Sequence, residues 1–175
     1  MQNMTAPTVA IVILNWNGKL FLEKFLPSVM ASVYPGKRIM VADNASTDDS
    51  IPFLEQQYPQ VEIIRNSSNK GFAKGYNTAL KQVQADYYIL LNSDVEVTAN
   101  WIAPIIELME SDRVIAACQP KILSYKNKDQ FEFHFVYFLP WKNQMVQSIR
   151  ENGGRVTCFG ARNNIQLMLK VWEVA

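Results

Sequence analysis

The chain has 175 residues, of which 49% are apolar and 19% charged, and its formal net charge is +1. This length and apolar content suit an α/β domain with a buried core and argue against disorder. A nearly neutral chain without a basic cluster lacks the electrostatics of a nucleic-acid binder, so no nucleic acid is expected among its partners.

Apolar, β-branched runs alternate with amphipathic stretches along most of the chain. Residues 9–14 predict a strand buried on both faces, and apolar residues at helical spacing from Leu20 to Val29 predict the next helix. Further strands are predicted at residues 38–42, 61–64, 87–91 and 114–118. Helices are predicted at 51–58 and 101–109, and a third follows the loop at 66–75 and runs through Leu80 and Val83. The alternation predicts a doubly wound, mainly parallel sheet with flanking helices.

Polar loops follow four of these strands, at residues 15–17, 43–48, 69–77 and 92–96. In open α/β sheets, ligands bind beyond the carboxyl ends of the strands, so four such loops predict one binding crevice. Any one loop alone is equally consistent with ordinary turn chemistry, since Asn, Asp, Ser and Gly favour turns.

The residue types in these loops suit a nucleotide diphosphate. The Asp43 carboxylate can accept the ring N–H of a pyrimidine, and Trp16 offers the base an apolar face. Asp94 can bind a hard divalent cation, Mg²⁺ or Mn²⁺, which would neutralise the diphosphate leaving group. The alternative for Asp94 is a helix cap or a solvated turn carboxylate.

Four motifs in this order resemble the family 2 glycosyltransferases, and most closely their rhamnosyltransferase-like branch. The motifs are Val-Ile-Leu-Asn-Trp-Asn-Gly, Val-Ala-Asp-Asn-Ala-Ser-Thr-Asp-Asp-Ser, Asn-Lys-Gly-Phe-Ala-Lys-Gly-Tyr-Asn and Leu-Leu-Asn-Ser-Asp-Val-Glu-Val. Their order and spacing match over about residues 8–123. The resemblance implies a GT-A type, Rossmann-like fold, a nucleotide-diphosphate sugar (UDP- or dTDP-sugar) and inversion at the anomeric carbon. The acceptor would be a saccharide or a lipid-linked molecule, in cell-surface polysaccharide biosynthesis.

The resemblance also assigns residues. Asp43 falls on the base-recognising carboxylate, with Asn44 where many members have a second Asp. Asn92 and Asp94 fall on the Asp-x-Asp motif, Asp94 being the metal ligand. The substrate-binding residues predicted in all are Asn15, Trp16, Asn17, Asp43, Asn44, Ser46, Gly71, Asn77, Asn92 and Ser93.

The chain divides, on this basis, into a nucleotide-sugar-binding GT-A domain at residues 1–132 and an unassigned tail at 133–175, where no family motif is found. The tail could be a truncated, divergent or frameshifted acceptor region. After Glu132 its only carboxylates are Glu151 and Glu173, and neither lies in the acidic pair that supplies the family's general base. No catalytic residue is therefore predicted, and a donor-binding or partner-binding remnant without turnover is the alternative function.

Other nucleotide folds fit less well. A nicotinamide-binding domain would carry Gly-x-Gly-x-x-Gly after the first strand, which residues 15–18 lack, and a P-loop is also missing. No signal peptide or membrane-spanning run is evident. The expected location is the cytoplasm, with peripheral contact at the inner face of the cytoplasmic membrane as an option.

Overall fold

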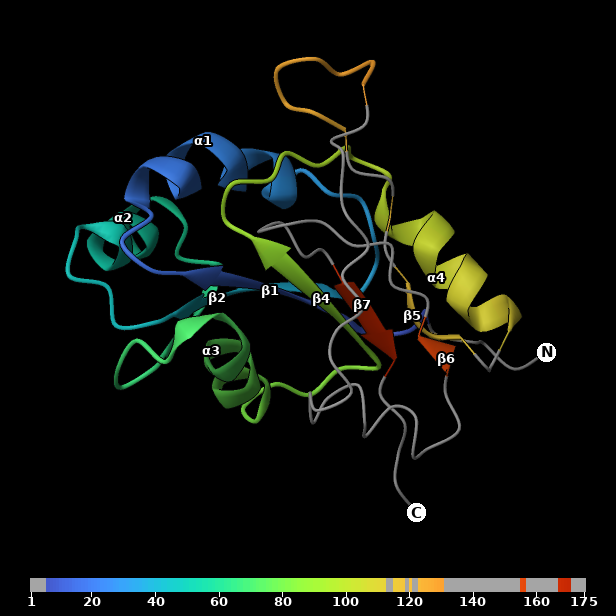
Figure 1. The fold of residues 1–175 in the computed structure, drawn as a ribbon, viewed down its shortest axis with the longest axis horizontal. Helices are drawn as coiled ribbons and strands as arrows, with labels where there is room; N and C mark the ends of the chain where they lie inside the picture. The colour runs from blue at the N-terminus through green and yellow to red at the C-terminus, as the bar shows by residue number, and fades with distance from the viewer. Residues whose placement is uncertain are drawn as a thin grey trace.

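The computed structural model describes residues 6–112, 115–118, 120, 123–130, 155–156 and 167–170. Within these residues, the strands form one sheet in the order β3-β2-β1-β4-β7-β5-β6 (Figure 1). Four of the strands, consecutive in the sheet, are parallel: β3 (Glu62–Arg65), β2 (Lys37–Asp43), β1 (Val9–Asn15) and β4 (Tyr87–Asn92).

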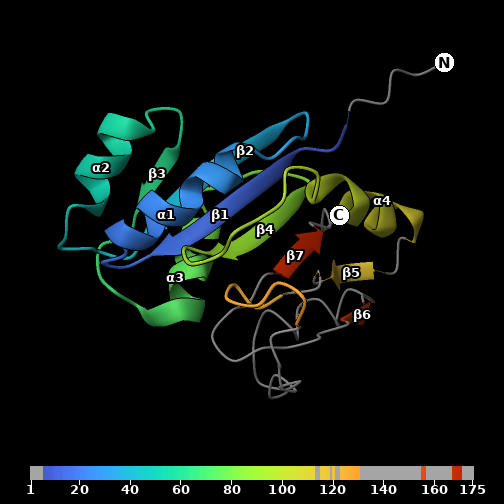
Figure 2. The same cartoon turned by 90° about the horizontal axis from the view of Figure 1, so that it is seen from above.

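Helices cover both faces of this parallel sheet, as Figures 1 and 2 show. They are α1 (Lys19–Met30), α2 (Ser50–Gln57), α3 (Gly71–Leu80) and α4 (Ile102–Ser111). Successive residues of β1 contribute to two different cores, because side chains alternate between the faces of a strand. Val9, Ile11 and Ile13 pack in a core with residues of α1, α2 and α4, whereas Ala10 and Val12 pack with residues of α3.

The far half of the sheet departs from the simple alternation. The predicted strand at 114–118 forms as β5 (Ile115–Cys118), but it does not pair with β4. β7 (Leu167–Lys170) lies between β4 and β5 and is antiparallel to both, while β6 (Arg155–Val156) pairs with β5. The sequence alone is consistent with either a short helix or a strand at 165–172. Sequence periodicity does not encode which distant segment pairs with the free edge of β4.

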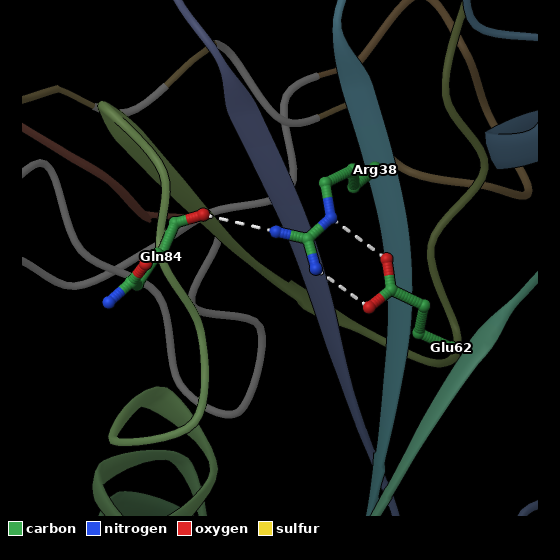
Figure 3. A network of polar contacts seen from close by, with 3 residues as sticks. All are labelled: Arg38, Glu62 and Gln84. Carbon is green, nitrogen blue, oxygen red and sulfur yellow. Dashed lines mark hydrogen bonds and ion pairs between the residues drawn. The ribbon is translucent and has the colours of Figure 1, made fainter.

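The amino edge of the sheet carries an ion pair remote from the predicted crevice. Arg38 of β2 donates two hydrogen bonds to the Glu62 carboxylate, at 2.9 and 2.7 Å, and a third to the carbonyl of Gln84, at 3.1 Å (Figure 3). The hydrogen bond to Glu62 raises the pKa of Arg38. These side chains are about half exposed, so the pair contributes little to stability, roughly 0–1 kcal/mol.

Among the residues that the structure describes, no helix is both long enough and apolar enough to cross a membrane.

Candidate functional site

The loops after β1, β2 and β4 meet at the carboxyl edge of the sheet. In the strand registers, Asn15 lies opposite Asp43 on one side, and Leu14 lies opposite Asn92 on the other. Parallel neighbouring strands run about 4.8 Å apart, so their last residues are immediate neighbours. The expected convergence of these loops is therefore confirmed.

Asn15, Asp43 and Ser46 form the centre of this edge. The Asn15 side-chain amide donates to Asp43 Oδ1 and to Ser46 Oγ, both at 3.2 Å, and the Ser46 backbone N–H donates to Asp43 Oδ2 at 2.9 Å. Asn15 is 0% and Asp43 3% exposed. Each carboxylate oxygen accepts one of these hydrogen bonds and has capacity for two, so within the described part of the chain each keeps a further lone pair. Asp43 is thus a carboxylate that is fixed by protein hydrogen bonds and can still accept a hydrogen bond from a ligand.

The first and second loops are bonded together through Asn17. Its side-chain oxygen accepts the backbone N–H of Thr47 at 2.7 Å and that of Asp48 at 3.3 Å, and its own N–H donates to Ser46 Oγ at 2.9 Å. Asn17 has φ +50°, a left-handed conformation that Asn tolerates better than most residues. Trp16 in the same loop is 58% exposed, which leaves its ring available to a ligand.

The third loop lies against the second. The Asn44 side chain donates to Asn69 and to the carbonyl of Gly71, and it accepts from Asn66. Gly71, at the start of α3, has φ +72°, which favours glycine. Asn77 lies further along α3 and is exposed.

Asn92, Ser93 and Asp94 form the fourth part of the edge. Asn92 ends β4, and Asp94 lies two residues beyond it and is exposed. The pKa of Tyr76 is raised by burial and, to a smaller extent, by the charge of Asp94. Ser93 lies beside Gly18, its hydroxyl 3.6 Å from the position a Cβ on Gly18 would occupy.

The described residues contain no cluster of three or more His, Cys, Asp or Glu side chains able to hold a metal ion. Asp94 therefore does not belong to a cluster of metal-binding side chains within that part of the chain. A carboxylate with an amide oxygen suits only a cation whose remaining ligands come from a phosphate group and water.

Two residues of this edge were missed by the sequence reasoning. Asp48 accepts the N–H of Lys19 at 3.1 Å and that of Ser50 at 3.0 Å, and so ties the starts of α1 and α2 together. Burial opposes ionisation of Asp48, but hydrogen bonds, including those from Ser50 and Lys19, leave its pKa lowered overall. Gly18 lies against Asn15, where a Cβ would be 2.4 Å from Asn15 Oδ1. Motif position could have flagged both residues, because Asp48 lies in the second motif and Gly18 lies in the first, three residues after Asn15.

Residues 10–164 match the sequence model of glycosyl transferase family 2, which is most of the chain. The chain belongs to glycosyl transferase family 2. The match runs past residue 123, where the motif resemblance ended. The members of this family are glycosyltransferases, so the chain belongs to a class of enzymes that transfer sugars.

Curated relatives of this family are longer than the chain. An uncharacterized glycosyltransferase of Haemophilus influenzae is 25% identical over 120 residues, covering 67% of this chain and 36% of the relative. The Escherichia coli protein WfaP, a UDP-Glc:alpha-D-GlcNAc-diphosphoundecaprenol beta-1,3-glucosyltransferase, is 29% identical over 107 residues, covering 61% of this chain and 43% of WfaP. The chain thus spans less than half the length of either relative.

Solved glycosyltransferase structures share the fold. Residues 1–349 of TarS from Staphylococcus aureus, in complex with UDP, superpose with a TM-score of 0.59 at 18% identity, covering 66% of this chain and 35% of that one. The mannosyltransferase PcManGT from Pyrobaculum calidifontis, in complex with GDP-Man and Mn²⁺, gives 0.55 at 20% identity, covering 65% and 35%. The predicted GT-A type fold is confirmed.

Proposed function

We propose that the chain binds a nucleotide-diphosphate sugar at the carboxyl edge of β1, β2 and β4, as the donor-binding part of an inverting glycosyltransferase. The observation that carries this proposal is the buried Asp43 carboxylate, which Asn15 and Ser46 hold in place. The loop after β1 also carries Trp16, whose side chain is 58% exposed. The fixed acceptor matches the ring N–H of a pyrimidine base, and an exposed aromatic side chain in the adjoining loop offers a surface on which the base could stack.

The sugar-nucleotide ligand is proposed to be a UDP- or dTDP-sugar. Asn15, Asp43 and Ser46 would hold the base side, and the third loop, with Gly71 and Asn77, would lie near the ribose and the diphosphate. This division follows the motif resemblance, and the structure of TarS with UDP belongs to a protein of the same fold. Rhamnosyl transfer is the donor specificity that the fourth motif favours.

A divalent cation, Mg²⁺ or Mn²⁺, is proposed to bind together with the nucleotide. Asp94 would be its protein ligand, with Asn92 and Ser93 beside it at the end of β4. When bound, the cation would neutralise charge on the diphosphate leaving group. PcManGT, a protein of the same fold, was solved with GDP-Man and Mn²⁺.

The acceptor is proposed to be a saccharide or a lipid-linked molecule, within cell-surface polysaccharide synthesis. The name of WfaP describes transfer to a sugar on diphosphoundecaprenol, and a second relative, from Bacillus subtilis, is named as a teichuronic acid biosynthesis glycosyltransferase. Such acceptors would bring the protein into peripheral contact with the cytoplasmic face of the membrane.

Calorimetric titration with UDP and dTDP tests the donor assignment. Asp43→Ala should weaken nucleotide binding by about 1–3 kcal/mol, the cost of losing a charged hydrogen-bond partner. Asp86→Ala is the matched control, because Asp86 also accepts two hydrogen bonds, both from Thr8 at 2.7 Å, but lies just before β4 at the opposite edge. Equal affinities of the two variants for nucleotide, with both folded, would refute the assignment.

A second function is a donor-binding protein without turnover. It is favoured by one feature of the sequence, the lack of a family-type acidic pair among residues 133–175. Glu151 and Glu173 both lie outside the described residues, so the crevice carries no assigned general base. Donor binding without measurable transfer would support this second function.

A further inference from the structure

We infer that Asn44 is a positioning residue, which holds the third loop in the shape that binds the nucleotide while making no contact with the nucleotide itself. The inference concerns a cluster of three amide side chains, Asn44, Asn66 and Asn69, called here the amide cluster. It rests on the proposed function, since it assigns to Asn44 a role different from the substrate contact that the motifs predict.

The Asn44 amide is used completely by protein partners. Its Nδ2 donates to Asn69 Oδ1 at 2.8 Å and to the carbonyl of Gly71 at 3.2 Å. Its Oδ1 accepts from Asn66 Nδ2 at 3.2 Å and from the Lys70 backbone N–H at 3.4 Å. An amide has two N–H donors and two acceptor lone pairs, so nothing remains for a ligand.

Two backbone carbonyls determine which way the amides point. Asn66 Nδ2 donates to the carbonyl of Gly75 at 3.2 Å, so this atom is a nitrogen and its other partner, on Asn44, is an oxygen. The opposite atom of Asn44 faces the carbonyl of Gly71, which only accepts, so that atom is the nitrogen. The orientation of Asn44 is therefore fixed from both sides.

The cluster joins the second loop to both ends of the first turn of α3. Gly71, Gly75 and Lys70 are all bonded to it, and Asn69 Oδ1 also accepts the Gly71 N–H at 2.9 Å. A Cβ on Gly75 would lie 3.1 Å from Asn44 Nδ2, so helix and amide are in close contact. The shape of the third loop consequently depends on one amide that belongs to the second.

An aspartate at position 44 would break this arrangement at a defined place. Its oxygens could still accept from Asn66 and Lys70, but the group facing Asn69 Oδ1 and the Gly71 carbonyl would change from a donor to an acceptor. Two oxygens would then face a carboxylate without a proton between them, which is unfavourable in a buried site. The third loop would be pushed away from the second.

Asn69 supplies a matched control, because only its oxygen is used. Asn69 Oδ1 accepts from Asn44 and Gly71, whereas no hydrogen bond of Asn69 Nδ2 is found among the described residues. Asn69→Asp keeps both bonds and is the same chemical change as Asn44→Asp. In the double variant two carboxylates would face each other, so its effect on affinity should exceed the product of the single effects.

The test is the affinity of the folded variants for UDP and dTDP, measured by calorimetry well below their unfolding temperatures. Asn44→Asp should weaken nucleotide binding about tenfold, as expected for two lost hydrogen bonds, while Asn69→Asp stays within about twofold of the wild type. Hydrogen exchange without ligand should show faster exchange of the Lys70 and Gly71 amides in Asn44→Asp only.

The outcomes separate this inference from the proposed function. Weaker binding together with faster loop exchange in Asn44→Asp supports the positioning role. Unchanged affinity of folded Asn44→Asp overturns it, as does an equal loss in Asn69→Asp. If Asp43→Ala and the wild type bind nucleotide equally well while Asn44→Asp binds less, the base assignment fails and the positioning role stands. A wild type that binds no nucleotide overturns both.

Discussion

Gly18 occupies a space that no other residue can enter without displacing Asn15. A Cβ there would lie 2.4 Å from Asn15 Oδ1, and the Asn15 side chain cannot move aside because it is bonded to Asp43 and Ser46. Gly18→Ala should therefore destabilise the fold by about 1–3 kcal/mol, a typical cost of overpacking. The measurement is urea unfolding followed by circular dichroism.

Gly71→Ala is a control that introduces backbone strain without a steric contact like that of Gly18 with Asn15. Gly71 has φ +72°, but a Cβ at this position would meet nothing within 4 Å, so only the left-handed backbone should cost energy, about 1–2 kcal/mol. Gly18→Ala should in addition weaken nucleotide binding, because it displaces Asn15. If Gly18→Ala binds nucleotide as the wild type does, the Asn15–Asp43 pair is not part of the base site.

Asp94 is expected to bind a divalent cation only when nucleotide is present. One carboxylate and an amide are too few ligands, so phosphate oxygens must complete the shell. Mn²⁺ should raise the affinity for UDP or dTDP, and Asp94→Asn should abolish this gain while leaving metal-free nucleotide binding intact. Titrations with and without Mn²⁺ measure both. A metal effect that survives in Asp94→Asn would exclude Asp94 as the ligand.

At the scale of elements, Tyr76 joins α3 to the ends of β1 and β4. Its hydroxyl donates to the carbonyl of Leu91 in β4 at 2.8 Å and accepts the N–H of Leu14 in β1 at 3.4 Å. Tyr76→Phe removes both bonds and should destabilise the fold by about 1–3 kcal/mol, because the buried carbonyl of Leu91 and the partly buried N–H of Leu14 each lose a hydrogen bond.

The same side chain predicts how stability depends on alkaline pH. Burial raises the pKa of Tyr76 above its ordinary value of 10.0, so above that pH the unfolded state loses this proton before the folded state does. Stability from Tyr76 is then complete below about pH 10 and falls as the pH rises further. Urea midpoints between pH 8 and 11 should fall less steeply for Tyr76→Phe than for the wild type. Parallel curves for the two proteins would contradict this.

At the scale of the whole molecule, residues 1–175 are expected to bind a sugar nucleotide but to transfer the sugar slowly or not at all. Loss of general-base assistance typically lowers turnover by about 10²–10⁴-fold while leaving binding intact. Donor affinity and transfer rate to a saccharide or lipid-linked acceptor should be measured on the same preparation.

Robust transfer by residues 1–175 would refute this prediction. It would then indicate Glu151 or Glu173 as the base, since these are the only carboxylates after Glu132. Glu151→Ala and Glu173→Ala, each assayed for donor affinity and for transfer, would identify which one acts. Substitution of the base should lower the transfer rate without changing the affinity.

The hydrophobic periodicity of the sequence predicted the parallel half of the sheet. The runs that became β1, β2, β3 and β4 are short and apolar, and each is followed by an amphipathic stretch, so their identity and direction follow from periodicity and right-handed connections. The shared edge follows as well, because parallel strands carry their loops to the same side of the sheet. Asp43 and Asn15 were therefore predictable as neighbours.

The amino-acid sequence by itself determined strands β1 to β5, the helices around them, the edge where the polar loops meet and the family to which the chain belongs. Only the tertiary structure decided that β7 lies between β4 and β5, and that the Asn44 amide is occupied by Asn66, Asn69 and Gly71. The physical reason is range: periodicity reports which way a side chain points along its own element, whereas a hydrogen bond between loops more than 20 residues apart depends on where the whole chain brings them together.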